Sequence, residues 1–282
     1  MQVVGIALVR NEDRFVRQAL LNVASFCDRI LVADHRSTDR TPEILRELSR
    51  DLDHLEVRRI AHSAESHAMI AGFAGTDTWI LSIDGDELYD PDRLVRFRRD
   101  LEGGAHRDVF RVRPAGLHCE ELDESQALAS GYLSPPSRPL VGLLNFGAIE
   151  SWTGVRSERL HGGDIRFRNG YDLDSWRHLG VEVGWEDSPF RDLHVCFLRR
   201  SSADPEVVPL TGRPNLAETS AFRRDLLGPL ERLARRVLGR GRAPTREAPE
   251  WKAEKYRRGE RAIVDASPFL RGTQAFPFLQ GT

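Results

Sequence analysis

The stretch from Trp79 to Glu87 constrains the fold more than any other part of the chain. An apolar run over residues 79–83 stops abruptly at Asp84-Gly85-Asp86-Glu87. Because apolar residues fill nearly every position instead of alternating with polar ones, the run predicts a strand covered on both faces of a sheet. Open α/β sheets place their ligand crevice just beyond the carboxyl ends of such strands. The acidic residues are therefore expected at a ligand site.

Asp84 and Asp86 flank Gly85, and this spacing suggests a cation site. Gly85 lets the backbone turn tightly enough for both carboxylates to point at one place. Two converging carboxylates repel each other unless a positive charge lies between them. Mg²⁺ or Mn²⁺, with oxygen ligands and substrate phosphates completing its shell, is the usual solution. The alternative is a polar turn followed by a helix cap, because short acidic turns are common.

The chain before this stretch alternates between strand and helix signals. Strands are predicted at residues 2–9, 29–33, 55–60 and 79–83. Helices are predicted after each strand, one of them beginning at Thr41 with Pro42 at its first position. This alternation predicts a Rossmann-like α/β fold whose mostly parallel sheet is flanked by helices. The polar strand ends should then share one rim.

The chain lacks the glycine motifs that hold phosphates in many nucleotide-binding proteins. No G-x-G-x-x-G follows the first strand, and no G-x-x-x-x-G-K-[ST] occurs. Phosphates at the predicted rim would therefore be held by a metal ion instead. Residues 114–140 are polar and punctuated by three prolines, and we expect them to form a loop over the crevice.

Composition excludes several classes of protein. The 282 residues carry a net charge of -2, which argues against a dedicated nucleic-acid binder. Cys27, Cys119 and Cys196 lie far apart without a C-x-x-C pair, which argues against a zinc site and a disulfide framework and suits a reducing cytosol. The N-terminus predicts a strand and not a signal peptide, and no apolar run reaches membrane-spanning length. We expect a cytoplasmic protein.

The character of the chain changes after Arg200. Residues 203–216 are rich in proline, and residues 217–238 predict an amphipathic helix with an arginine-rich face. We therefore expect a domain over residues 1–200 and a helical C-terminal extension over residues 201–282 packed on it. Peripheral contact of the basic helix with the inner face of a membrane is the alternative, although it would need more exposed apolar bulk.

Three segments together resemble the family 2 glycosyltransferases of the GT-A fold. They are residues 9–12 (VRNE), residues 30–41 (ILVADHRSTDRT) and residues 80–87 (ILSIDGDE). The resemblance covers residues 1–100 well and residues 101–200 loosely. It departs at His35, where many members carry a second aspartate, so the nucleobase of the donor stays open.

The resemblance implies a nucleotide-sugar site at the predicted rim. It implies that Asp84 and Asp86 are the D-x-D pair that holds Mn²⁺ or Mg²⁺ against the donor diphosphate. His194 resembles the late histidine that often completes the metal shell, and the alternative is a hydrogen-bonded histidine in a half-buried strand. The residues implied to contact the nucleotide are Val9, Asn11, Glu12, Asp34 and Asp84.

Inverting members of the family need a carboxylate base to deprotonate the acceptor hydroxyl. Residues 184–189 (GWEDSP) resemble the E-D motif of the family, which would make Asp187 the base. Residues 154–158 (GVRSE) resemble a G-x-x-H-E pattern, which points to Glu158, although Ser157 stands where a histidine is expected. Asp187 is the preferred candidate.

The predicted function is therefore metal-dependent, inverting transfer of a sugar from a nucleoside-diphosphate sugar to a hydroxyl acceptor, such as a glycan, a polysaccharide or a lipid-linked saccharide. A sugar-1-phosphate nucleotidyltransferase is one alternative, but these enzymes usually carry a glycine-rich loop after the first strand. A non-catalytic relative that only binds nucleotide or glycan is the other.

Overall fold

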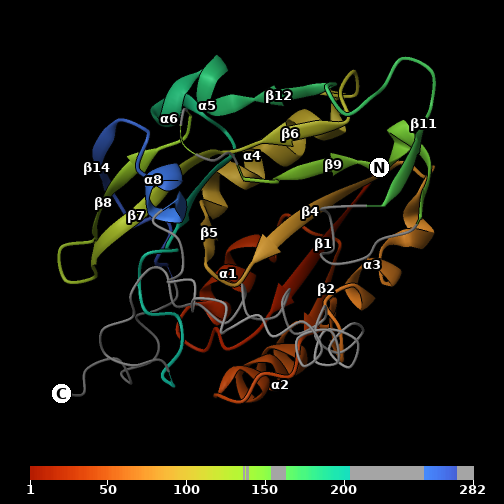
Figure 1. Cartoon of the computed structure of the whole chain (residues 1–282). Helices are drawn as coiled ribbons and strands as arrows, with labels where there is room; N and C mark the ends of the chain where they lie inside the picture. The colour runs from red at the N-terminus through yellow and green to blue at the C-terminus, as the bar shows by residue number, and fades with distance from the viewer. Residues whose placement is uncertain (136, 138–139, 154–162, 204–250, 272–282) are drawn as a thin grey trace, which may run out of the picture.

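The computed structural model describes residues 1–135, 137, 140–153, 163–203 and 251–271. Within these ranges the chain forms a seven-stranded sheet, a five-stranded sheet and a two-stranded ribbon. Figure 1 shows the larger sheet at the centre, with the smaller sheet beside it at the left. The predicted α/β class is confirmed.

The larger sheet has the strand order β12-β6-β9-β4-β1-β2-β3. Its strands are β1 (Gln2–Val9), β2 (Arg29–Asp34), β3 (Leu55–Arg59), β4 (Thr78–Asp84), β6 (Arg111–Arg113), β9 (Leu143–Asn145) and β12 (Trp176–His178). Strand β1 pairs in parallel with β2 and with β4, and β9 is the antiparallel strand that joins β4 to β6. The sheet is therefore mostly parallel, as predicted.

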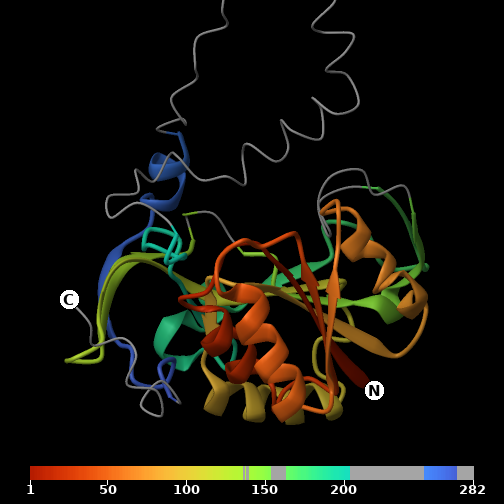
Figure 2. The same ribbon diagram turned by 90° about the horizontal axis from the view of Figure 1, so that it is seen from below.

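Helices and loops bury both faces of this sheet. Helices α1 (Val16–Val23), α2 (Thr41–Asp51) and α4 (Pro91–Glu102) pack on one face, where Leu20, Leu45 and Phe97 are fully buried. On the other face, Ile70, Phe146 and Trp152 pack against the sheet. The elements near them are the short helix α3 (Glu65–Ala68), the 3-10 turns η1 (Ala71–Phe73) and η2 (Phe146–Ala148), and the ribbon of β10 (Ile149–Thr153) with β11 (Asp164–Phe167). Figure 2 shows α1, α2 and α4 together on their side of the sheet.

The prediction of a loop over residues 114–140 is wrong. Strands β7 (Ala115–Asp123) and β8 (Leu128–Leu133) form an antiparallel hairpin there. The polar residues that suggested a loop belong to the second half of β7, where the hairpin is exposed. Leu117 and Cys119, in the first half, pack in a hydrophobic core. The prolines fall after β8, so they end the hairpin rather than interrupt it.

The hairpin belongs to the smaller sheet, with the order β14-β8-β7-β13-β5. Its other strands are β5 (Glu87–Tyr89), β13 (Arg191–His194) and β14 (Arg261–Asp265), and two short helices, α5 (Leu179–Glu182) and α6 (Gly184–Asp187), precede β13. Strand β5 follows directly from the acidic turn after β4. The turn therefore joins the two sheets.

The described part of the C-terminal segment packs on the rest of the chain. Helix α8 (Trp251–Tyr256) and β14 lie along the hairpin, and β14 pairs antiparallel with β8. Beyond β14, Phe269 is fully buried and its ring stacks on Trp185. The predicted helix at residues 217–238 lies outside the described residues, and the division at residue 200 stays a prediction.

Among the described residues, no helix is long and apolar enough to cross a membrane.

Candidate functional site

The structure brings together the residues predicted to contact a nucleotide. Val9 lies opposite Asp34 in the β1–β2 register, and Leu8 lies opposite Asp84 in the β1–β4 register. These strands are parallel, so their carboxyl ends form a single rim. Asp34 is buried and Asp84 is partly exposed there. The rim matches the usual ligand position in α/β sheets.

Asn11 ties the turn after β1 to the turn after β2. Its φ of 54° lies in the left-handed region, which asparagine tolerates better than most residues. Its Oδ1 accepts a hydrogen bond from Thr38 N at 2.8 Å, and its backbone N donates to Ser37 Oγ at 3.0 Å. Asp34 Oδ1 accepts from Ser37 N at 2.9 Å. The two turns are therefore fixed relative to each other.

Glu12 packs directly on the acidic turn. A Cβ at Gly85 would lie 2.8 Å from Glu12 Cγ, too close for any side chain, so glycine is needed for this contact. The Glu12 backbone N donates to Thr41 Oγ1 at 2.8 Å. Glu12 is buried, and its carboxylate lies beside the turn that carries Asp86. Three acidic side chains, Glu12, Asp84 and Asp86, thus gather at the end of β4.

Arg200 supplies positive charge to this acidic group. Its Nη1 lies 2.6 Å from Asp86 Oδ2 and 3.0 Å from Glu12 Oε1, and all three side chains are buried. Burial opposes the charge on Arg200, but Asp86 and Glu12 raise its pKa above the ordinary value. The sequence analysis missed Arg200, because no local pattern distinguishes it from Arg199 beside it.

The segment around Arg200 is anchored across the rim. Ser201 Oγ donates to Asp39 Oδ2 at 2.6 Å, and Ser202 N donates to Asp13 Oδ1 at 2.7 Å. Arg14 N donates to the carbonyl oxygen of Arg200 at 3.1 Å. These bonds reach the turns after both β1 and β2, so they fix the position of the guanidinium.

His194 lies at the end of β13, between Asp86 and a second histidine. Its Nε2 is 3.6 Å from Asp86 Oδ2, and its Nδ1 is 2.9 Å from His118 Nδ1. Burial opposes a charge on His194, but Cys196 and Asp86 raise its pKa well above the ordinary value. Of the three predicted metal ligands, the structure therefore places Asp86 and His194 in contact, while Asp84 lies closer to solvent.

The side chains at the rim offer the type of ligand atom that a hard divalent ion prefers. Asp84 and Asp86 offer the carboxylate oxygens that Mg²⁺ and Mn²⁺ prefer. However, the guanidinium of Arg200 lies against an oxygen of Asp86. An ion bound by both carboxylates would therefore compete with Arg200 for Asp86.

Asp192, on β13, is a further buried acidic residue near the rim. Neither of its carboxylate oxygens has a hydrogen-bond partner. Burial, followed by the negative charge of Glu87, raises its pKa well above the ordinary value. The surroundings of Asp192 therefore disfavour the charged form of its carboxyl. No sequence signal marked it.

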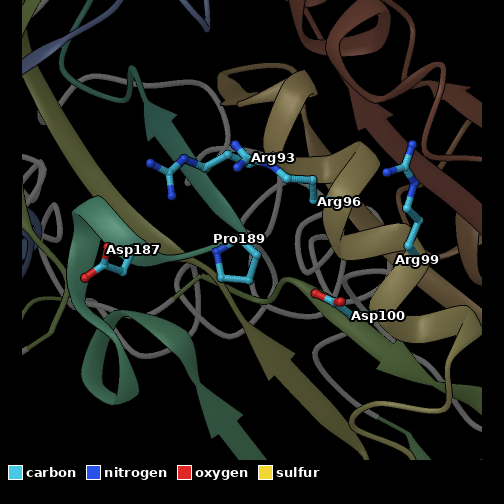
Figure 3. A pocket seen from close by; sticks show the side chains of 6 residues that line it. All are labelled: Arg93, Arg96, Arg99, Asp100, Asp187 and Pro189. Atoms are coloured by element: carbon cyan, nitrogen blue, oxygen red, sulfur yellow. The ribbon is translucent and has the colours of Figure 1, made fainter.

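Of the two predicted catalytic bases, the structure describes only Asp187. Asp187 ends α6, before β13 begins, whereas His194 is at the other end of that strand. Asp187 and Pro189 line a pocket of about 340 Å³ together with Arg93, Arg96 and Arg99 of α4. Figure 3 shows these residues around it. Glu158 lies outside the described residues. The base therefore stays a prediction from the resemblance.

The mostly parallel sheet flanked by helices is consistent with a GT-A type of α/β domain. Residues 6–126 match the family model of Glycosyl transferase family 2. The matched range contains Val9, Asn11, Glu12, Asp34, Asp84 and Asp86. No curated protein matches the chain.

Solved structures similar to the chain share only part of their length with it. TarS from S. aureus is 19% identical over 45% of this chain and 24% of its own, with a TM-score of 0.34. The mannosyltransferase PcManGT from Pyrobaculum calidifontis, in complex with GDP-Man and Mn²⁺, is 22% identical over 41% of this chain and 35% of its own, with a TM-score of 0.32. Glucosyl-3-phosphoglycerate synthase from Mycobacterium tuberculosis, in complex with Mn²⁺ and UDP, is 15% identical over 41% of this chain and 44% of its own, with a TM-score of 0.31. The chain thus spans less than half the length of each.

Proposed function

We propose that the chain transfers a sugar from a nucleoside-diphosphate sugar to a hydroxyl acceptor, with inversion at the sugar carbon. The supporting observation is the convergence of Asn11, Glu12, Asp34 and Asp84 at one rim of a mostly parallel sheet. The match of residues 6–126 to Glycosyl transferase family 2 supports this proposal.

In this proposal the turns after β1 and β2 hold the nucleoside. Asp34 is fixed by its bond from Ser37 N, and Asn11 by its bond from Thr38 N. Side chains held in this way need little reordering when a ligand binds, which lowers the entropy cost of binding. The diphosphate would lie toward Asp84 and Arg200, where the rim carries both signs of charge.

We propose that Asp84 and Asp86 hold a divalent ion together with the diphosphate. The ion would offset the negative charge that builds up on the departing diphosphate. Arg200 already neutralises part of the acidic group, so Arg200→Met should strengthen Mn²⁺ binding in the absence of donor by about tenfold or more. Calorimetric titration with Mn²⁺ measures this change. Binding that is unaltered by the substitution would exclude competition between Arg200 and the ion.

Two carboxylates, Asp187 and Glu158, are the candidates for the base that deprotonates the acceptor hydroxyl. Loss of a general base lowers kcat by about 10²–10⁴-fold, while donor binding is retained. Asp187→Asn and Glu158→Gln should therefore differ in kcat if only one carboxylate is the base. Asp187, from the E-D pattern of residues 184–189, is the preferred candidate. A loss of kcat confined to Glu158→Gln would overturn this preference.

The donor site can be tested by thermal shift with UDP, GDP and dTDP, each with and without Mn²⁺. A ligand that binds the native state raises the melting temperature. We expect one nucleoside diphosphate to raise it most, and Asp34→Asn to remove most of that rise. Asp123→Asn is the matched control, since Asp123 is exposed on the β7–β8 hairpin. Equal shifts in both variants would contradict the assignment of Asp34.

Turnover separates the three candidate activities. Release of a nucleoside diphosphate from the sugar nucleotide supports the transferase. Release of pyrophosphate from a nucleoside triphosphate and a sugar 1-phosphate would instead support a nucleotidyltransferase. Nucleotide binding that is indifferent to Mn²⁺ and to EDTA, with no product in either assay, would support a non-catalytic relative.

A further inference from the structure

A cluster of three buried metal-ligating side chains lies behind the rim. It consists of His118 on β7, His194 at the end of β13, and Cys196 two residues later. One ligand atom from each residue lies within 4.8 Å of the others. The parallel register of β7 and β13 sets His118 directly beside His194, so the sheet itself holds the two imidazoles together.

The spacing of these atoms is close to that of a tetrahedral metal site. Zinc lies about 2.0–2.1 Å from histidine nitrogen and about 2.3 Å from cysteine sulfur, so neighbouring ligand atoms are roughly 3.3–3.6 Å apart. The two Nδ1 atoms are 2.9 Å apart. An opening of a few tenths of an ångström would therefore seat an ion between them.

The surroundings of the cluster resemble those of bound metal ions. A histidine that binds a metal through one nitrogen usually directs the other at a carboxylate. His194 has this arrangement, because its Nδ1 faces His118 and its Nε2 faces Asp86 Oδ2 at 3.6 Å. The ring of Tyr256 on α8 covers both imidazoles edge-on, with centroids 4.6 Å and 5.4 Å away. The cluster is thus enclosed, unlike the partly exposed Asp84.

We propose that His118 Nδ1, His194 Nδ1 and Cys196 Sγ bind a zinc-type transition-metal ion, separate from the ion at the rim. Nitrogen and sulfur donors favour such an ion over Mg²⁺ or Mn²⁺, which prefer oxygen. The wide spacing of the cysteines argues against a zinc site built from cysteines alone, but two histidines that are distant in sequence complete this one. The bound ion links β7 to the segment that continues from β13 toward Arg200.

The site can be tested by spectroscopy on the full chain, independently of any transferase activity. After removal of metal with a chelator, the chain is loaded with Co²⁺ or with Zn²⁺. We expect about one ion per chain, visible d–d bands typical of tetrahedral Co²⁺, and a near-ultraviolet thiolate-to-cobalt band. Cys196→Ser should remove the thiolate band, and His118→Gln should weaken binding by about 10-fold or more.

Two variants serve as matched controls. Cys119→Ser alters a neighbouring buried thiol that donates to Glu121 O instead, so it should keep the thiolate band. Asp84→Asn alters the rim and should leave Co²⁺ binding to the cluster unchanged. A folded wild-type chain with no thiolate band, or a band that survives in Cys196→Ser, would overturn the proposal. If Cys196→Ser does not fold, wild-type Co²⁺ binding together with His118→Gln decides the question.

Discussion

Arg200 Nη1 lies 2.6 Å from Asp86 Oδ2, although the two residues are 114 positions apart in the chain. Both side chains are buried, and Glu12 shares the same guanidinium nitrogen at 3.0 Å. The acidic turn after β4 is therefore partly neutralised by a residue from a late segment. The rim depends on that segment for its charge balance.

Removal of Arg200 should destabilise the chain. Breaking a buried ion pair by removing one partner costs about 3–5 kcal/mol, because the other charge stays buried without compensation. We expect Arg200→Met to lower the free energy of unfolding by about 3 kcal/mol. In urea denaturation, the double variant Arg200→Met with Asp86→Leu should lose less than the sum of the two single losses.

Arg199→Met is the matched control for the Arg200 and Asp86 variants. Arg199 donates from Nε to the Ser201 carbonyl at 3.0 Å and from Nη2 to the Ser202 carbonyl at 2.5 Å. Both partners are neutral and near in sequence, so the loss of Arg199 should change stability by less than about 0.5 kcal/mol. Additive losses in the double variant would show that Arg200 and Asp86 do not interact energetically.

Gly85→Ala should disrupt the acidic turn. The new Cβ would lie 2.8 Å from Glu12 Cγ and 2.9 Å from Glu12 Cβ, so Glu12 must move away from Arg200. Overpacking of this kind costs about 1–3 kcal/mol. We expect a fall in the melting temperature and weaker nucleotide binding. Gly72→Ala is the control, since a Cβ there meets nothing within 4 Å, and equal behaviour of the two variants would contradict this prediction.

The docked C-terminal segment should contribute measurably to stability. Phe269 is fully buried against Trp185, and Asn22 Nδ2 donates to the Phe269 carbonyl at 2.9 Å. Loss of a buried phenylalanine side chain costs about 3–5 kcal/mol, so Phe269→Ala should fall in that range. Ile263→Ala, at a side chain that is 73% exposed on β14, should change stability little. Chemical denaturation of both variants checks the difference.

His178 should make the fold sensitive to acid. Burial, with a smaller effect of Arg113, lowers the pKa of His178 from 6.5 to about 4. As the pH falls below about 6.5, the unfolded chain binds a proton that the folded chain does not, so stability is lost until about pH 4. Between pH 7 and pH 4.5 the contribution is roughly 2 kcal/mol.

His178→Leu removes this titration, so its stability should fall less between pH 7 and pH 4.5 than that of the wild type. His62→Leu is the control, because His62 is exposed. Urea denaturation at the two pH values measures the difference, and an unchanged pH dependence in His178→Leu would contradict the assignment.

Local sequence patterns were enough to predict the parallel strands and the main helices of the first hundred residues. The apolar run at 79–83 predicted a buried strand, and the turn signals at Thr41 and Pro42 predicted a helix that begins there. Parallel strands place their carboxyl ends together, so the gathering of Val9, Asp34 and Asp84 followed from strand order alone. The hairpin over residues 115–133 was missed, because half of it is exposed and its polar composition resembles that of a loop.

The amino-acid sequence by itself determined which residues end strands, and so which side chains meet at the rim, because strand and helix periodicity are properties of neighbouring residues. Only the tertiary structure decided that Arg200 pairs with Asp86, that His118 stands beside His194, and that Asp187 faces α4. The histidine pair depends on the register between β7 and β13, and the other two contacts depend on how late segments pack on early ones. No local pattern encodes that register, because it is set by how the two sheets pack and by the turn at Gly85 that joins them.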